Sequence, residues 1–154
     1  MGEDERALEL ALRHLNRRDR TEAELRRHLA GRDVGEKAAD HAIAEVVRMG
    51  YVDDARYARV FAEDRRTLDG WGAERIERRL LALGVDGEHV AAAIGAREGA
   101  DELQAALELL RRRCRDVPAG ERERERALGM LVRKGYDLDL AYDAVRAFER
   151  AAAA

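Results

Sequence analysis

The sequence has little of what disulfide scaffolds, β-sheets and membrane spans require. Its 154 residues include one cysteine, one proline and one tryptophan. A single cysteine, Cys114, excludes an internal disulfide framework and fits a reducing compartment. No run of about 18 apolar residues is present, and the acidic N-terminus lacks the apolar segment of a secretory signal. We therefore expect a cytoplasmic protein without a membrane segment.

Charge is abundant but slightly negative in sum. Charged residues make up 40% of the chain and the net charge is −3, which argues against simple wrapping of a nucleic-acid backbone. Lys37 and Lys134 are the only lysines among 29 basic residues. GC-rich codon usage explains most of this bias, although the arginine fork also suits carboxylate and phosphate contacts. The abundance of Ala, Leu, Glu and Arg predicts an all-helical protein.

Apolar residues recur three times with a period of 51 residues. The six columns of this repeat are Leu25, Ile76 and Ala127; Leu29, Leu80 and Leu131; Val34, Val85 and Tyr136; Ala39, Val90 and Ala141; Ala42, Ala93 and Ala144; and Ile43, Ile94 and Val145. The spacing predicts a helix that ends near Gly31, Gly84 or Gly135, where glycine can be left-handed. A tight turn and a second helix follow in each copy.

A further helix precedes each pair, so the spacing predicts nine helices. Their expected ranges are 5–17, 21–31, 36–49, 54–68, 72–83, 87–96, 100–115, 119–134 and 138–150. The starts are marked by a Thr21–Glu24 capping box, by Asp53 and Asp54, and by Pro118. Leu68 is expected on the apolar face of its helix.

Three short helices bury little apolar surface alone, so we expect the copies to stack. The predicted fold is an all-α, elongated and curved array of three tandem three-helix repeats, stacked right to left. The predicted domains are residues 1–52, 53–99 and 100–154. Such an array offers a long concave face that suits an extended partner.

Three motifs in this order resemble those of the RecX family of bacterial regulatory proteins. The family's signature is similar to Gly50-Tyr51-Val52-Asp53-Asp54-Ala55-Arg56-Tyr57-Ala58. Its first-repeat motif resembles Arg20-Thr21-Glu22-Ala23-Glu24-Leu25-Arg26-Arg27-His28-Leu29, and its second resembles Gly70-Trp71-Gly72 running into Ile76, Leu80, Gly84 and Val85. The resemblance spans roughly residues 8–150.

This resemblance implies a non-enzymatic regulator that binds the RecA recombinase, chiefly as its filament on single-stranded DNA. RecX-like proteins restrain strand exchange, ATP hydrolysis and co-protease activity, and so act in recombination, DNA repair and the SOS response. We expect a monomer that needs no cofactor and makes only weak, nonspecific contact with DNA.

Arginine clusters are the candidate contacts with the partner or with DNA. They comprise Arg17, Arg18, Arg20, Arg26 and Arg27 in the first repeat, Arg65, Arg66, Arg75, Arg78 and Arg79 in the second, and Arg111, Arg112 and Arg113 in the third. The alternative is that most of them form solvated faces with local ion pairs. Arg27 and Arg78 are one period apart, so a basic position recurs.

The signature residues are expected to be mainly structural. Asp53 and Asp54 fit a helix cap with a first-turn acid better than a metal or catalytic pair. Tyr51 and Tyr57 are expected to pack between repeats, and Trp71 to be a packing wedge, with partner contact as the alternative for each.

No motif predicts a catalytic, metal or cofactor site. The histidines are scattered and Cys114 has no cysteine partner, so zinc-ligand spacing is missing. Phosphate-cradling glycine loops and nucleophile elbows are missing as well. Sequence-specific helix-turn-helix binding is disfavoured, because the third helix of each repeat begins with acids and alanines. Two alternatives stay open: a helical-repeat protein that contacts DNA directly through its arginine clusters, and a helical scaffold for a different partner.

Overall fold

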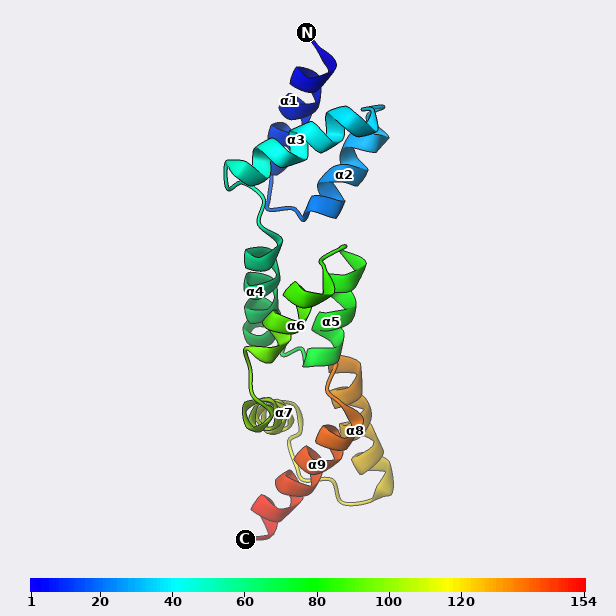
Figure 1. The fold of residues 1–154 in the computed structure, drawn as a ribbon. Coiled ribbons are helices and arrows are strands. Elements are labelled where there is room, and N and C mark those ends of the chain that lie inside the picture. The colour runs from blue at the N-terminus through cyan, green and yellow to red at the C-terminus, as the bar shows by residue number, and fades with distance from the viewer. The chain divides into compact units, whose positions relative to one another are not determined.

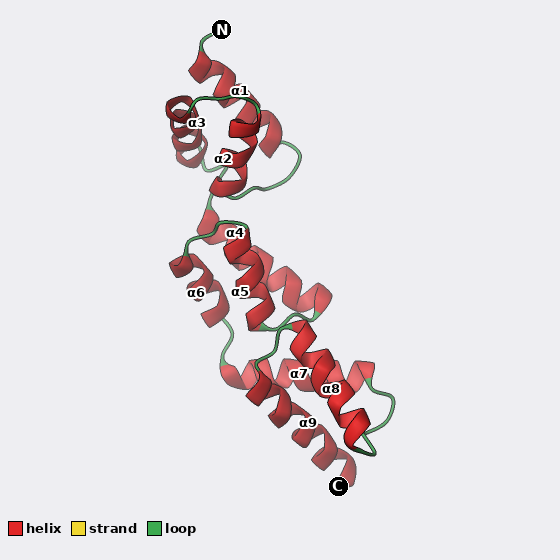
Figure 2. Ribbon diagram, turned by 90° about the vertical axis from the view of Figure 1, so that its right-hand side faces the viewer, coloured by secondary structure: helices red, strands yellow, loops and turns green.

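Nine α-helices follow one another in three groups of three, and no strand is present (Figures 1 and 2). The computed structural model describes residues 1–154. The first triad is α1 (Glu3–Leu15), α2 (Glu22–Gly31) and α3 (Glu36–Arg48). The second is α4 (Asp54–Asp64) with the π-helical turn η1 (Arg65–Asp69), α5 (Ala73–Ala82) and α6 (Gly87–Gly95). The third is α7 (Gly99–Arg113), α8 (Glu121–Lys134) and α9 (Leu138–Ala153). The predicted tandem of three-helix repeats is confirmed.

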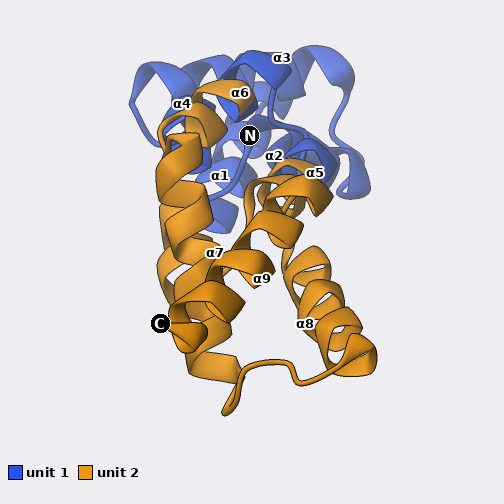
Figure 3. Ribbon diagram, turned by 90° about the horizontal axis from the view of Figure 1, so that it is seen from below, with its two compact units in different colours: residues 1–60, 80–90 blue, residues 61–79, 91–154 orange.

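The chain divides into two compact units, and the division runs through the second triad (Figure 3). One unit holds residues 1–60 and 80–90, and the other holds residues 61–79 and 91–154. The C-terminal end of α5 therefore belongs with the first triad, whereas its N-terminal end belongs with the third. None of the helices combines the length and the apolar character that crossing a bilayer requires.

The core of the first triad is built largely from alanine. Ala7 and Ala11 of α1 are fully buried, as is Ala42 of α3, and Ala38 and Ala39 are nearly so. These small side chains let the backbones of α1 and α3 approach closely, and the two helices are in contact. The larger side chains of this core come mainly from α2 and from the ends of α3.

The third triad has a core of larger side chains. Leu109 and Leu110 of α7, Leu131 of α8, and Tyr136 are at most 2% exposed. Helix α9 lies against both α7 and α8 and contributes Val145 to this cluster. Seventeen of the eighteen residues in the six repeat columns are buried, and Ile94 is partly buried. The period therefore reflects which residues form the interior.

Each triad has the same turn between its second and third helices. One amide per turn donates to the carbonyl five residues earlier, which closes the helix end. The pairs are Val34 with Leu29 (3.1 Å), Val85 with Leu80 (3.1 Å) and Tyr136 with Leu131 (3.0 Å). The preceding residue is left-handed in all three turns, at Asp33 (φ 60°), Gly84 (φ 82°) and Gly135 (φ 100°).

The predicted role of Gly31 in the first turn is wrong. Gly31 is the last residue of α2, and Asp33 takes the left-handed position. Aspartate tolerates this conformation better than most residues, because its short polar side chain can bond locally. Asp33 is one 51-residue period before Gly84, so the register of the repeat, rather than the nearest glycine, marks the turn.

Two further local predictions are also wrong. Leu68 is 73% exposed, because the chain widens into the π-helical turn η1 and the extra residue in that turn rotates Leu68 away from the core. Pro118 does not open α8, which begins at Glu121 after an extended Gly120. Helical periodicity alone signals neither deviation.

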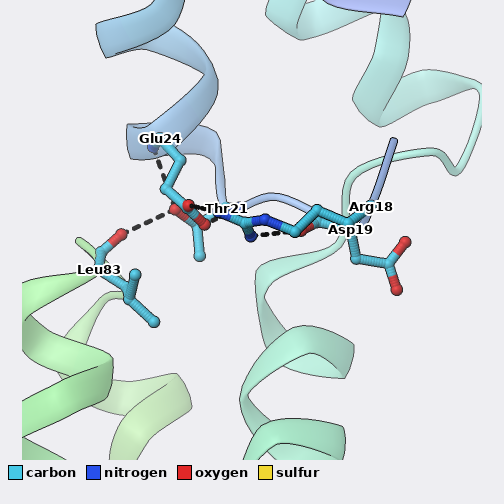
Figure 4. Close-up of polar contacts among 5 residues, drawn as sticks. All are labelled: Arg18, Asp19, Thr21, Glu24 and Leu83. Atoms are coloured by element: carbon cyan, nitrogen blue, oxygen red, sulfur yellow. Dashed lines mark hydrogen bonds and ion pairs between the residues drawn. The ribbon is translucent and has the colours of Figure 1, made fainter. Parts of the chain in front are cut away.

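Thr21 joins the first triad to the end of α5. Its buried hydroxyl accepts a hydrogen bond from the Glu24 amide (3.1 Å) and donates one to the Leu83 carbonyl (2.7 Å). The Glu24 carboxylate accepts from the Thr21 amide in return (3.1 Å), which completes the predicted capping box (Figure 4). One hydroxyl thus caps α2 and satisfies the Leu83 carbonyl, which follows the last residue of α5.

An equivalent junction joins the start of α5 to the third triad, one period later. The Gly72 amide donates to the Lys134 carbonyl (2.8 Å), and the Glu74 amide donates to the Gly135 carbonyl (2.9 Å). A β-carbon at Gly72 would lie 2.6 Å from the Gly135 backbone. Because no side chain fits there, the backbone amide makes the contact that the Thr21 hydroxyl makes in the first junction.

A carboxylate from the following triad completes each junction. The Asp54 carboxylate accepts from the Glu22 amide at 3.0 Å, and the Glu102 carboxylate accepts from the Ala73 amide at 3.0 Å. Glu22 and Ala73 are the first residues of α2 and α5 and are one period apart. The negative charge also complements the helix dipole. Both junctions therefore satisfy the N-terminus of a middle helix with groups from the next triad.

We predict that Thr21→Val lowers the free energy of unfolding by about 2 kcal/mol, because it removes a cap and leaves the Leu83 carbonyl without its partner. Urea unfolding followed by circular dichroism measures the change. Thr21→Ser keeps the hydroxyl and loses only a buried methyl group, so it should be the less destabilised variant. A Val variant as stable as the parent would show that these hydrogen bonds contribute no net stability.

Candidate binding surface

The first-triad arginines lie on the α1–α2 loop and on α2, and they fall into two groups. Arg18 pairs with Glu24 (2.8 Å), and Arg26 of α2 pairs with Asp40 of α3. Arg17 and Arg27 are exposed and form no ion pair. These two guanidinium groups therefore remain available to a partner, whereas Arg18 and Arg26 already have one within the protein.

Two histidines stack face to face beside this cluster. The His14 ring of α1 and the His28 ring of α2 are 3.6 Å apart and only 4° from parallel. Burial, the neighbouring His28 and the positive charges of Arg20 and Arg18 lower the pKa of His14 to about 4. Burial and the charge of Arg32 lower the pKa of His28 as well. Both rings are therefore neutral at pH 7.

Most second-triad arginines serve the fold rather than the surface. Arg65 pairs with Asp69 within the π-helical turn. Arg66 donates to the Ala93 and Ile94 carbonyls at the end of α6, and its desolvation lowers its pKa. Arg75 donates to the Arg133 carbonyl (3.2 Å). The bonds of Arg66 and Arg75 satisfy carbonyls at helix C-termini that otherwise lack partners.

Arg78 and Arg79 of α5 are different, because both are exposed and neither forms an ion pair. Arg78 occupies the position of Arg27 one period later, so successive middle helices carry a free guanidinium at the same place. In the third triad, Arg111, Arg112 and Arg113 end α7 and are exposed without ion pairs. Their charges complement the C-terminal end of that helix dipole.

Trp71 is held between two arginines and an aromatic ring. Its ring meets Phe61 edge to face (6.1 Å between centroids), and the Arg65 and Arg75 guanidinium groups lie 5.9 Å and 4.2 Å from its centroid. Cation–π attraction and this packing fix the indole at the start of α5. All three contacts lie within the second triad, and the expected packing between repeats stays a prediction.

The signature residues divide between caps and surface. The Asp53 carboxylate accepts from the Arg56 amide (3.0 Å) and caps α4, which lowers its pKa. Asp54, expected to complement its own helix, instead caps α2, and burial raises its pKa. Tyr57 is partly buried near Arg18. Tyr51 is 55% exposed, so the expectation that it packs between repeats is wrong.

Glu102 is a buried junction residue that the sequence motifs do not identify. This buried carboxylate accepts from the Ala73 amide and from Arg97 (2.9 Å). A signal is nevertheless present, because Glu102 lies four and seven residues before the buried Ala106 and Leu109 and so falls on the apolar face of α7. A charged residue at such a position needs a partner inside the fold.

These features define an all-helical protein of three tandem three-helix domains joined by repeated polar junctions. Sequence models of the first, second and third three-helix domains of RecX match residues 7–45, 53–94 and 100–145, respectively. The chain belongs to the RecX family of regulatory proteins.

Relatives named regulatory protein RecX are similar over most of the chain. The Thermobifida fusca protein is 35% identical over 144 residues, which cover 92% of this chain and 77% of the relative. The Stenotrophomonas maltophilia protein is 35% identical over 130 residues, which cover 84% and 78% of the two chains.

Solved structures of RecX share the fold. The crystal structure of RecX from Lactobacillus salivarius superposes with a TM-score of 0.83 at 17% identity, covering 96% of this chain and 97% of that one. A second crystal structure of a regulatory protein RecX gives a TM-score of 0.77 at 19% identity, covering 94% of this chain and 71% of the other.

We predict that acid destabilises the fold partly through His14. Because its pKa is lowered from 6.5 to about 4 in the folded state, the unfolded chain binds the proton first. Stability contributed by the neutral ring is therefore lost as the pH falls below 6.5, with a slope of up to about 1.4 kcal/mol per pH unit. His14→Phe keeps a ring on His28 and should reduce this slope in urea unfolding measured from pH 7 to 4.5. Equal slopes in both proteins would contradict the prediction.

Proposed function

We propose that this protein binds the RecA recombinase, chiefly as its filament on single-stranded DNA, and inhibits recombination, ATP hydrolysis and co-protease activity. The observation that carries the proposal is the ordered match of all three RecX domains along the chain. The protein acts as a monomer and without catalysis of its own, in the cytoplasm where RecA works. Its relatives are named regulatory proteins, which supports this role.

The mechanism is steric and electrostatic. Helices α2 and α5 are each anchored at the N-terminus to the following triad, so similar polar contacts join neighbouring domains at both junctions. Arg27 and Arg78 are exposed at equivalent positions of two successive domains. Contacts that recur along the chain match a partner whose protomers recur, and simultaneous engagement makes a filament a better target than a free subunit.

Direct binding of DNA is a second candidate function. It is favoured by the exposed Arg17, Arg27 and Arg78, which lack acidic partners within the protein. The net charge of −3 limits this contact to local, salt-sensitive attraction. Tight, sequence-selective binding of duplex DNA at physiological salt would favour this candidate over the regulation of RecA.

We predict that the purified protein slows DNA-dependent ATP hydrolysis by the RecA of the same organism at substoichiometric ratios, because one molecule contacts several protomers. A coupled ATPase assay on preformed filaments measures the rate against the molar ratio. Bovine serum albumin at matched concentrations controls for nonspecific effects. An unchanged rate at every ratio up to equimolar would reject inhibition.

We predict that Arg27→Glu combined with Arg78→Glu weakens binding to the filament by about tenfold or more, because each reversal replaces attraction with repulsion. Both side chains are exposed and unpaired, so helicity should be unchanged. Fluorescence anisotropy of labelled filaments measures the affinity.

Arg122→Glu combined with Arg150→Glu is the matched control, because it makes the same charge change at exposed arginines that form no ion pair and lie outside the candidate clusters. Equal affinity of the test and control variants would reject the recurring basic position as a contact.

A further inference from the structure

Several arginine side chains lie near the stacked histidines, and few carboxylates are present to neutralise their charge. Arg17, Arg18 and Arg20 approach from the α1–α2 loop, and Arg32 follows α2. Glu24 of α2 is the one carboxylate that faces the pair. Its oxygens are already taken by Arg18 and by the Thr21 amide. The other charges therefore lack a counter-ion within the protein.

Arg20 is the least satisfied member of the group. Its Nε is buried and has no hydrogen-bond partner. Burial and the charges of Arg18 and Arg17 lower its pKa, with Glu24 and Tyr57 of α4 acting in the opposite direction. An unpaired buried donor costs free energy, so Arg20 gains from a local rearrangement that brings an oxyanion acceptor to its guanidinium group.

The two rings add a feature that ordinary arginine patches lack. The rings are stacked at 3.6 Å, and both are neutral at pH 7 when no anion is present, because burial and the nearby guanidinium groups lower their pKa values. A phosphate group supplies negative charge and oxygen acceptors at the same place. Protonated imidazole then becomes a donor instead of a source of repulsion.

We propose that His14, His28, Arg17, Arg20 and Arg32 form a phosphate-binding site that takes up a proton onto an imidazole when the oxyanion binds. The ligand is a phosphate oxyanion, supplied either by a nucleic-acid backbone or by a free phosphate. The step is a protonation of one ring nitrogen from solvent, with no covalent bond to the ligand. This proposal rests on the second candidate function, direct contact with DNA, and assigns that contact to named residues. Its test does not involve RecA, so a negative result would reject the phosphate site without bearing on the regulation of RecA.

Linkage sets the expected pH dependence. If binding favours the protonated ring, then the bound anion raises the pKa of His14 above about 4, and lowering the pH tightens binding. Affinity can change by up to about tenfold per pH unit for one proton. We expect a several-fold gain in affinity between pH 7.5 and pH 5.5.

The first test is a nuclear magnetic resonance titration of the full chain at constant ionic strength. Imidazole Cε1–H resonances report the pKa values of His14 and His28 without ligand, with pyrophosphate, and with an abasic deoxyribose-phosphate oligomer. A rise in either pKa with at least one ligand supports the site, and the ligand that acts identifies the source. Unchanged pKa values with both ligands at saturating concentration would overturn the proposal.

Variants supply a second, independent readout. Arg20→Gln should weaken binding of the effective ligand at least fivefold, whereas Arg13→Gln, which removes an arginine already paired with Glu9, should not. His14→Phe combined with His28→Phe preserves the ring stack but cannot take up a proton, so affinity should lose most of its pH dependence. If this double variant fails to fold, His14→Gln serves instead. A full pH dependence in a folded histidine variant, or unchanged binding by Arg20→Gln, would overturn the proposal.

Discussion

The structure depends on how the N-terminus of one helix is satisfied by the next domain. A helix start leaves backbone amides without partners, and burial makes those amides costly. Here, α2 and α5 both begin where the following triad offers a carbonyl beside a left-handed turn and a carboxylate from its first helix. Because each contact requires the neighbouring domain to be folded, the polar groups couple domains whose own cores are small.

Glycine is needed where the turn of one domain packs against the middle helix of the preceding domain, because the two backbones are too close for a side chain. A β-carbon at Gly84 would overlap the Ala23 side chain, and one at Gly135 would overlap Arg75. Both positions also have φ above +80°, which disfavours side chains for a second reason. In the first turn the left-handed residue is Asp33, which is exposed and therefore has room for a side chain. Close contact with the preceding domain thus explains the glycine in the second and third turns, and the exposed position explains the aspartate in the first.

The sequence predicts the helices and their order well because buried apolar residues recur with the 51-residue period. The columns headed by Leu25 and Leu29 identify core positions directly. What it cannot predict are contacts between residues far apart in sequence. Asp54 reads as a cap of its own helix, and only the fold reveals that it caps α2. The predicted burial of Leu68 is wrong for a local reason, because the π-helical turn changes the register that α-helical periodicity assumes. Composition likewise gives the number of arginines but does not show which of them form ion pairs within the protein.

The distinction between paired and unpaired arginines decides which of them can act on a partner. Arg65 pairs with Asp69, Arg66 donates to the Ile94 carbonyl at the end of α6, and Arg75 lies over the Trp71 ring. Breaking these contacts in order to bind a partner would cost stability. Arg27 and Arg78 carry no such cost, because each is exposed and unpaired. A net negative protein can still attract an anion at these places, since screening confines electrostatic attraction to about 10 Å at 0.1 M salt. Local imbalance of charge, rather than total charge, therefore decides which surface is the better candidate for binding an anion.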